Sequence, residues 1–130
     1  MKLIDSVLLD TVTESAKSDT RLRRNYNFHS SFDSKAQRLL NALEPGTVIP
    51  AHRHLYTSET YVLLRGKLKV RFYNDEKEQS SEFELDPNIG VYGVDIPKGQ
   101  WHSIEVLESG TVIFEVKDGP YTPLESKDTI

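Results

Sequence analysis

Three of the four histidines in the chain lie in two short stretches that could bind a metal ion. His52 and His54 are two residues apart, and on a β-strand such residues point to the same face, roughly 6.5–7 Å apart. If residues 55–58 form a turn, Glu59 returns beside them with a carboxylate oxygen. Imidazole and carboxylate ligands suit Fe(II), Mn(II), Ni(II), Cu(II) or Zn(II). An isolated pair of histidines is more often a solvated turn, so the pair alone does not establish a site.

Two further features favour a metal site over a solvated turn. Gly46 and Gly66 flank the first stretch where strands need tight turns. Pro97 and Gly99 predict another turn, after which His102 opens a strand. A third histidine at a strand start, across a barrel, can complete a set of three imidazoles and one carboxylate.

The residues after position 35 predict the sheets that would hold these side chains. Short apolar or alternating runs are separated by turn signals such as EPGT, DPN, PKGQ and ESG. In residues 67–73, three apolar side chains alternate with three basic ones, as in a half-buried strand. This pattern predicts a mostly all-β fold, an antiparallel sandwich or barrel.

The N-terminal stretch predicts one short helix. Its apolar residues fit a helical stripe, and Asp5 or Ser6 can cap a helix over residues 6–18. A β-strand over residues 4–12 is the alternative.

A chain of 130 residues fits one domain, residues 1–130. We divide it into an N-terminal helical extension (1–20), a β-barrel (36–117) and an irregular C-terminal tail (118–130). The net charge of −4 argues against nonspecific nucleic-acid binding. The chain has no cysteine, and hence neither disulfides nor thiolate metal ligands.

The apolar runs are too short for a membrane span, which needs about 20 residues. Asp5 and Asp10 interrupt the apolar N-terminus, which is unlike a signal peptide. We therefore expect a cytoplasmic protein with no membrane or nucleic-acid partner.

Residues 46–66 resemble the first motif of the cupin superfamily. The matching positions, in register, are Gly46, His52, His54, Glu59 and Gly66. Residues 90–106 resemble the second motif, with His102 at its histidine position. The gap between Gly90 and Pro97 is one residue longer than usual, and Val106 stands where the motif has Asn.

This resemblance implies a double-stranded β-helix, or jelly-roll barrel, with the short N-terminal helix added, and often a homodimer. It also implies one divalent metal per chain (Fe, Mn, Ni or Zn), held by His52, His54, Glu59 and His102. Such a set fills four positions of an octahedron and leaves two for water, substrate or dioxygen.

A narrower resemblance covers about residues 1–128. The runs RRNYNFH, QRLLNAL, PAHRH and FEVKDGPY are similar to the WbuC family of cupin-fold metalloproteins. That family is named for a member associated with bacterial O-antigen gene clusters. The association suggests surface polysaccharide or sugar-nucleotide chemistry, although a fold alone does not assign a function.

Five further residues are candidates for binding a small-molecule substrate: Arg24, Asn27, His29, Tyr61 and Arg65. On a strand, Asn27 and His29 share one face with Asn25, while Arg24 lies on the other. This run can form a polar rim of the pocket or a solvated edge strand, and the pattern favours neither.

Tyr61 and Arg65 have the parity of Glu59 on the next predicted strand. Tyr61 can hydrogen-bond a ligand, and Arg65 can meet an anionic group. Packing in the barrel wall is the favoured alternative for Tyr61, and a surface ion pair for Arg65.

Two residues near the predicted site have open roles. Val112, Phe114 and Val116 form an apolar face, so we predict that Glu115 points outward as a solvated charge. Inward, it could act as a base beside a cation. Trp101 should point away from the neighbouring histidine, as a lid, a dimer contact or simple packing.

These residues favour a metal-dependent enzyme that acts on a small polar molecule, such as a carbohydrate or nucleotide sugar. Isomerase, epimerase and dioxygenase chemistry are all compatible with the ligand set. The alternative is a noncatalytic binding or sensor cupin in which the metal anchors a ligand. A structural cupin with an empty site is disfavoured, because buried imidazoles and a carboxylate without a partner are costly.

Overall fold

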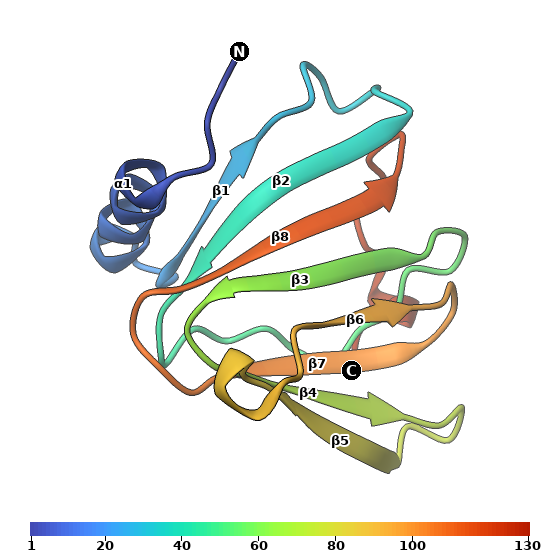
Figure 1. Cartoon of the computed structure of the whole chain (residues 1–130). Helices are drawn as coiled ribbons and strands as arrows, with labels where there is room; N and C mark the ends of the chain where they lie inside the picture. The colour runs from blue at the N-terminus through green and yellow to red at the C-terminus, as the bar shows by residue number, and fades with distance from the viewer.

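The computed structural model describes residues 1–130 as two facing antiparallel sheets with one α-helix outside them (Figure 1). The first sheet has the strand order β1 (Arg23–Asn27), β2 (Ala36–Leu43), β8 (Thr111–Asp118), β3 (Glu59–Arg65) and β6 (Gly93–Ile96). The second has the order β5 (Gln79–Leu85), β4 (Leu68–Tyr73) and β7 (Trp101–Val106). Two single-turn 3-10 helices lie at Pro87–Ile89 and Ser126–Asp128. The predicted mostly β architecture with one N-terminal helix is confirmed.

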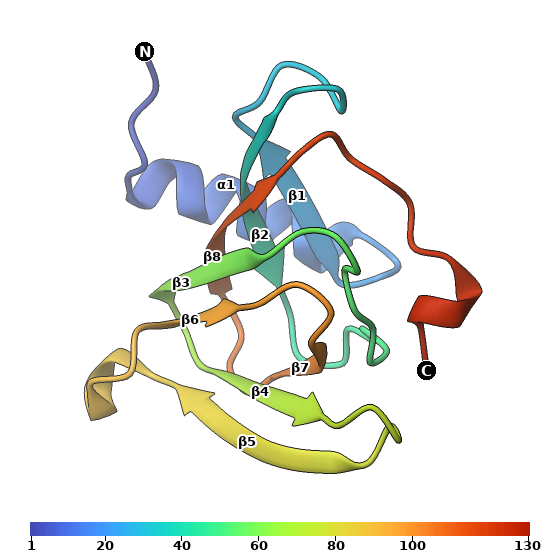
Figure 2. The same cartoon turned by 90° about the vertical axis from the view of Figure 1, so that its right-hand side faces the viewer.

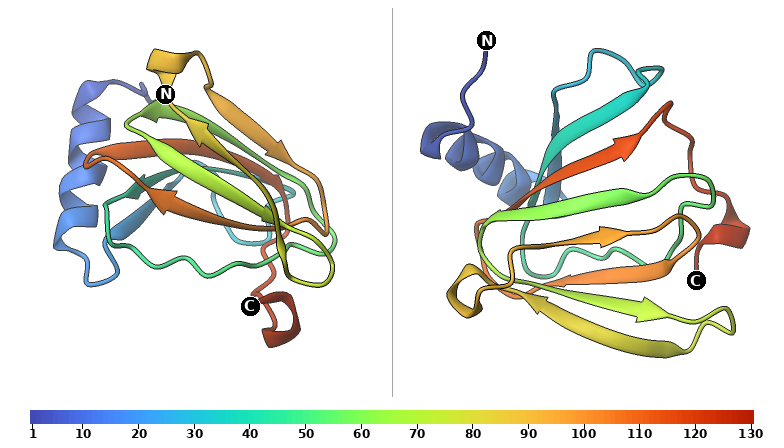
Figure 3. Two further views of the ribbon diagram at one scale, coloured as in Figure 1. Left: turned by 90° about the horizontal axis from the view of Figure 1, so that it is seen from below. Right: turned by 45° about the vertical axis from the view of Figure 1, so that its right-hand side comes forward.

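Helix α1 (Ser6–Ser18) has the predicted bounds, so the alternative strand is wrong. The Leu8 backbone N–H donates to the Asp5 side chain at 3.0 Å, which satisfies one of the free donors at the helix start. The helix packs on the outer face of the first sheet (Figure 3). Its buried contacts form a small cluster of Val12, Ala16, Leu40, Ala42 and Val112. No helix has the length and apolar character needed to cross a membrane.

The first sheet begins upstream of the predicted barrel boundary at residue 36. Strand β1 pairs antiparallel with β2, and Asn25 lies opposite Asn41. Because cross-strand partners point to the same face, the register carries β1 side chains into the interior of the barrel.

The space between the sheets changes from apolar to polar along the strands. Its main core consists of Leu43, Tyr61, Leu63, Leu68, Val70, Leu85, Ile96, Ile104, Val106 and Ile113. Along β3 the inward residues run from Leu63 to Glu59, and along β7 from Val106 to His102. The polar ends of both sheets therefore meet at the same end of the barrel.

Gly66 carries the turn between β3 and β4 with a φ of 96°. A Cβ there would lie 2.6 Å from the Cα of Thr111, so a side chain cannot fit without a backbone shift. We expect Gly66→Ala to lower the free energy of unfolding by about 2–4 kcal/mol in urea titrations. The matched control is Gly90→Ala, which has a φ of 78° but no atom within 4 Å of the added Cβ. Equal losses in the two variants would show that the close approach to Thr111 is unimportant.

Candidate metal centre

Four side chains meet at the polar end of the barrel. The ligand atoms of His52, His54, Glu59 and His102 all lie within 4.8 Å of one another. Glu59 is the first residue of β3 in the first sheet, and His102 lies on β7 in the second. His52 pairs with His102 through two backbone hydrogen bonds of 2.9 Å, which extends the second sheet by one short segment. The structure thus brings together all four residues named by the motif resemblance.

Glu59 lies at the centre of this cluster and is almost fully buried. Its Oε1 accepts a hydrogen bond from the Tyr61 hydroxyl at 2.8 Å. The same oxygen lies 2.8 Å from Nε2 of His102 and 3.5 Å from Nε2 of His54. Burial raises the pKa of Glu59, but the neighbouring His102, His54 and Tyr61 outweigh burial and lower it to about 2. The carboxylate is therefore ionised at neutral pH.

Backbone carbonyls fix the orientation of two imidazole rings. Nδ1 of His52 lies 2.9 Å from the Pro50 carbonyl oxygen, and Nδ1 of His102 lies 2.9 Å from that of Gln100. A carbonyl oxygen can only accept, so these contacts assign the proton to Nδ1 in each neutral ring. The Nε2 lone pairs are then free for a metal, as in most histidine-ligated sites.

Nε2 of His102 is buried and has no hydrogen-bond partner. It lies 2.8 Å from the ionised Glu59 oxygen, a contact that needs a proton or a cation between the two atoms. Such groups are costly to bury unless a cation or a proton lies between them. A divalent cation would satisfy both at once, so the donor set fits a metal.

The other two histidines are held in the form that binds metals. Burial, reinforced by the nearby His102, lowers the pKa of His52 to about 4. Burial also lowers the pKa of His54. Both imidazoles are therefore neutral at pH 7, the protonation state that metal coordination requires.

Glu115 points into the barrel, so the predicted outward orientation is wrong. The side chain is buried, and the Asn41 side-chain amide donates to its Oε1 at 3.0 Å. The apolar residues Val112 and Phe114 on the opposite face of β8 pack under helix α1, which the strand pattern did not include. Burial, followed by the negative charge of Glu59, raises the pKa of Glu115 to about 7.

The structure separates the two candidates on β3. Tyr61 lies in the cluster, where burial and the Glu59 charge raise the pKa of its hydroxyl well above the usual value. Arg65 lies away from it: a bulge after Leu63 shifts the register. The Arg65 guanidinium contacts Asp10 of helix α1 at 2.7 Å, consistent with the favoured surface ion pair.

The candidates before β2 are not at the metal cluster. Arg24 lies on the outer face and pairs with Asp19 at 3.5 Å. Asn27 is exposed, and His29 is bound through Nδ1 to the Arg38 backbone at 3.1 Å. These three side chains are absent from the lining of the cavity beside the cluster.

That cavity, of about 430 Å³, is lined by three of the four cluster residues and by several polar side chains that sequence reasoning missed. We call it the inner cavity. Its additional polar lining includes Arg23, Asn25, Asn41, Glu115 and Lys117. The alternation in RRNYN could have indicated Arg23, which has the same parity as Asn25. Only the sheet register shows that Asn41 and Lys117 share this wall.

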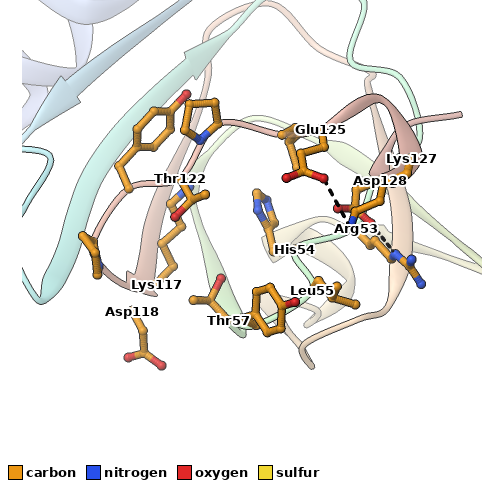
Figure 4. A pocket seen from close by; sticks show the side chains of 15 residues that line it. Arg53, His54, Leu55, Thr57, Lys117, Asp118, Thr122, Glu125, Lys127 and Asp128 are labelled. Atoms are coloured by element: carbon orange, nitrogen blue, oxygen red, sulfur yellow. Dashed lines mark hydrogen bonds and ion pairs between the residues drawn. The ribbon is translucent and has the colours of Figure 1, made fainter.

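Leu124 and Thr129 of the C-terminal tail, residues 119–130, line the inner cavity. The end of the tail lies beside the segment before β3 (Figure 2). The Ile130 N–H donates to the Ala51 carbonyl at 2.7 Å, and Arg53 Nε donates to Asp128 at 2.8 Å. A smaller cavity of about 120 Å³ lies between the tail and residues 53–57, with His54 in its wall (Figure 4). The tail therefore covers the approach to the metal cluster from this side.

We expect Asp128→Ala to loosen this cover, because Asp128 is buried and is bound to Arg53. Loss of a charged hydrogen bond should speed metal extraction by EDTA about tenfold. The measurement is the rate of metal transfer to the chelator in stopped flow. Asp118→Ala, at an exposed aspartate in the same smaller cavity, is the control. Identical rates in the two variants would contradict a covering role.

Trp101 is buried beside this segment, with the Arg53 guanidinium 4.8 Å from its ring centre. Of the three predicted roles, the structure shows packing. The ring also lies within 5.3 Å of the Lys77 ammonium, and both contacts are of the cation–π kind.

Several solved structures are similar to this chain. CapF from Staphylococcus aureus, a capsular polysaccharide assembling protein, matches with 23% identity and a TM-score of 0.62, covering 76% of this chain and 27% of CapF. The cupin domain of Schizosaccharomyces pombe Cnp3 matches with 11% identity and a TM-score of 0.59, covering 74% and 64%. KdgF from Halomonas sp. matches with 15% identity and a TM-score of 0.57, covering 81% and 82%. The chain thus spans about a quarter of the CapF chain and most of KdgF. No curated protein matches it.

The two-sheet barrel, its structural neighbours and the histidine–glutamate cluster define a cupin-fold protein with a site able to bind a metal. The predicted cupin fold is confirmed. The chain belongs to the family described as Domain of unknown function (DUF6016), whose model matches residues 4–85.

Proposed function

We propose that this chain is a metal-dependent cupin enzyme that acts on a small polar substrate, a carbohydrate or nucleotide sugar of surface polysaccharide metabolism. His52, His54, Glu59 and His102 hold one divalent cation per chain, either Fe, Mn, Ni or Zn. The observation that carries the proposal is the buried, unpartnered Nε2 of His102 facing the ionised Glu59 oxygen. The donor set of three imidazoles and one carboxylate suits these metals.

When bound, the cation would act as a Lewis acid on a carbonyl or hydroxyl group. The chain itself supplies a group for proton transfer. Glu115 lines the same cavity, and with a pKa of about 7 it can both donate and accept a proton near neutral pH. The Asn41 amide, 3.0 Å from Glu115 Oε1, holds the carboxyl group in place. Such a group suits the proton transfers of an isomerase or epimerase.

Two likenesses support the substrate class. CapF is a capsular polysaccharide assembling protein, and 27% of its chain matches this one. The similarity of the RRNYNFH and PAHRH runs to the WbuC family points to surface polysaccharide genes as well. We therefore propose a WbuC-like role in a bacterial cell.

The domain organisation and assembly are part of the same proposal. We propose one cupin domain over residues 1–130 that forms a homodimer in the cytoplasm. Light scattering coupled to gel filtration would measure the mass of the particle against the 14.8 kDa of one chain. A monomer at micromolar concentration would contradict the dimer.

The test of the function begins with elemental analysis of untagged protein. We expect about one metal per chain, followed by turnover in a screen of sugars and nucleotide sugars that is lost in His52→Ala. Oxygen uptake in the same screen would redirect the assignment to a dioxygenase. A rise in melting temperature with a ligand but no turnover would support the noncatalytic binding or sensor cupin instead.

A further inference from the structure

We infer that the inner cavity selects an acidic, hydroxyl-bearing small molecule, with Lys117 binding its oxyanion group and Arg23 binding its opposite end. The inference rests on the proposed function, since it names the substrate class of the same site. It concerns the wall opposite the histidines, formed by β1, β2 and β8.

The two cations stand apart from the other basic side chains of the protein. Seven lysines and arginines are half-buried. Five of them have a carboxylate oxygen within 4.0 Å, and these are Arg53, Arg65, Lys67, Lys69 and Arg71. The two exceptions are Arg23 and Lys117, and both line the inner cavity. Neither cation has a carboxylate in direct contact, so an anion from outside the chain would stabilise this wall.

Lys117 is positioned beside the metal cluster. On β8 it lies directly opposite Glu59 of β3, so the two side chains leave the sheet on the same face. Its ammonium group lies 5.7 Å from the Tyr121 ring centre. Glu115, two residues earlier on β8, faces the same side, but neither Glu115 nor Glu59 has a carboxylate oxygen within 4.0 Å of the Lys117 ammonium group. Lys117 can therefore reach an oxyanion bound next to the metal.

Arg23 lies deeper along the same wall. Its register partner is Leu43 of β2, which faces the barrel core. Nη1 donates to the Val48 carbonyl at 2.9 Å, which fixes the guanidinium and leaves further N–H groups for a ligand. Val48 is four residues before His52, so chain geometry places the guanidinium within about 17 Å of the His52 backbone. In the register, Arg23 is level with Leu43 of β2 and Lys117 with Gln37, six residues along that strand, so the two cations meet opposite ends of a ligand.

The amides between the two cations indicate hydroxyl groups on the ligand. Asn41 uses its N–H to bind Glu115, while its Oδ1 is buried and has no partner. That oxygen can only accept, so it suits a hydroxyl or amine donor of the ligand. Asn25, opposite Asn41 in the register, adds a further amide to the same lining.

The charge of the cavity is opposite to that of the whole chain. The protein has a net charge of −4. With a divalent cation at the cluster, Glu59 offsets only half of the metal charge. Arg23 and Lys117 then keep the cavity positive, even if Glu115 is ionised. The cavity therefore favours an anion over a neutral sugar.

The test is isothermal titration of protein of known metal content with three six-carbon probes: gluconate, sorbitol and sorbitol 6-phosphate. We expect gluconate or the phosphate to bind at least tenfold more tightly than neutral sorbitol. Lys117→Gln should weaken binding of that acid about tenfold or more, and Arg23→Gln should also weaken it, without a change in metal content in either variant. The exposed Arg38→Gln and Lys98→Gln are the matched controls and should bind it as the wild type does.

The probes and variants separate the sources of binding. Tight gluconate alone assigns the wall to carboxylates, tight sorbitol 6-phosphate alone assigns it to phosphates, and either outcome supports the inference. Equal binding of all three probes, or no binding of any, overturns it. Acid binding that is lost in His52→Ala but unchanged in both cavity variants also overturns it, because the metal alone would then hold the anion. If each protein has a full metal content but the acid does not bind, the proposed metal site is retained and only the anion-binding role of Arg23 and Lys117 is refuted.

Discussion

His102→Ala is expected to reduce the bound metal from about one ion per chain to almost none. His102 supplies the most buried imidazole of the cluster, and its Nε2 lies closest to the Glu59 oxygen. Removing one of four ligands should weaken metal binding by at least about a hundredfold, more than the loss of an outer-shell partner. Elemental analysis after dialysis, followed by competition with a chelator of known affinity, measures the effect.

The fourth histidine provides the control for this experiment. His29 is outside the cluster and bonds to the Arg38 backbone, so His29→Ala should keep its metal. His54→Gln tests the same site if loss of the buried His102 ring prevents folding, because His54 is more exposed. Retention of one metal per chain in both His102→Ala and His54→Gln would refute the assigned ligand set.

Glu115→Gln is expected to stabilise the metal-free protein at pH 8 and to change it little at pH 5. The pKa of Glu115 is about 7 in the folded chain, against a reference value of 4.5. Between these pH values the folded state binds more protons than the unfolded state, so stability falls as the pH rises. At pH 8 the buried charge costs up to about 3 kcal/mol, which the neutral glutamine avoids.

Urea unfolding in EDTA at the two pH values measures this difference. The lowered pKa of His52 has the opposite effect below pH 6.5, but it acts in both proteins and cancels in the comparison. Glu84→Gln, at an exposed glutamate on β5, controls for the change of residue type. If Glu115→Gln changes the free energy of unfolding equally at pH 5 and pH 8, the pKa of Glu115 is not raised in the folded protein.

The metal cluster could be predicted because its information is local. His52, His54 and Glu59 lie within eight residues of one another, so their spacing can be recognised without knowing how the barrel closes. Only His102 comes from a distant part of the sequence. Helix α1 was predictable for a similar reason, since Asp5 and the apolar stripe act within a few residues.

The cavity wall depends on pairings that the sequence does not show. Glu115 was assigned outward because one apolar face was taken to mean one core, whereas β8 has a core on each side: the barrel interior and the underside of α1. The bulge after Leu63 likewise removed Arg65 from the face of Glu59. Asn41 and Lys117 were missed since their place depends on which strands become neighbours.

The origin of the ligands in both sheets also has a consequence for folding. His52 and His102 belong to the second sheet and Glu59 to the first, and Glu59 is 43 positions before His102 in the chain. A bound ion would therefore be a cross-link between the sheets, closing a loop that in a disulfide of this length contributes about 4 kcal/mol. The chain has no cysteines and hence no disulfide between the sheets. We expect amide hydrogen exchange in both sheets to slow together when the ion binds.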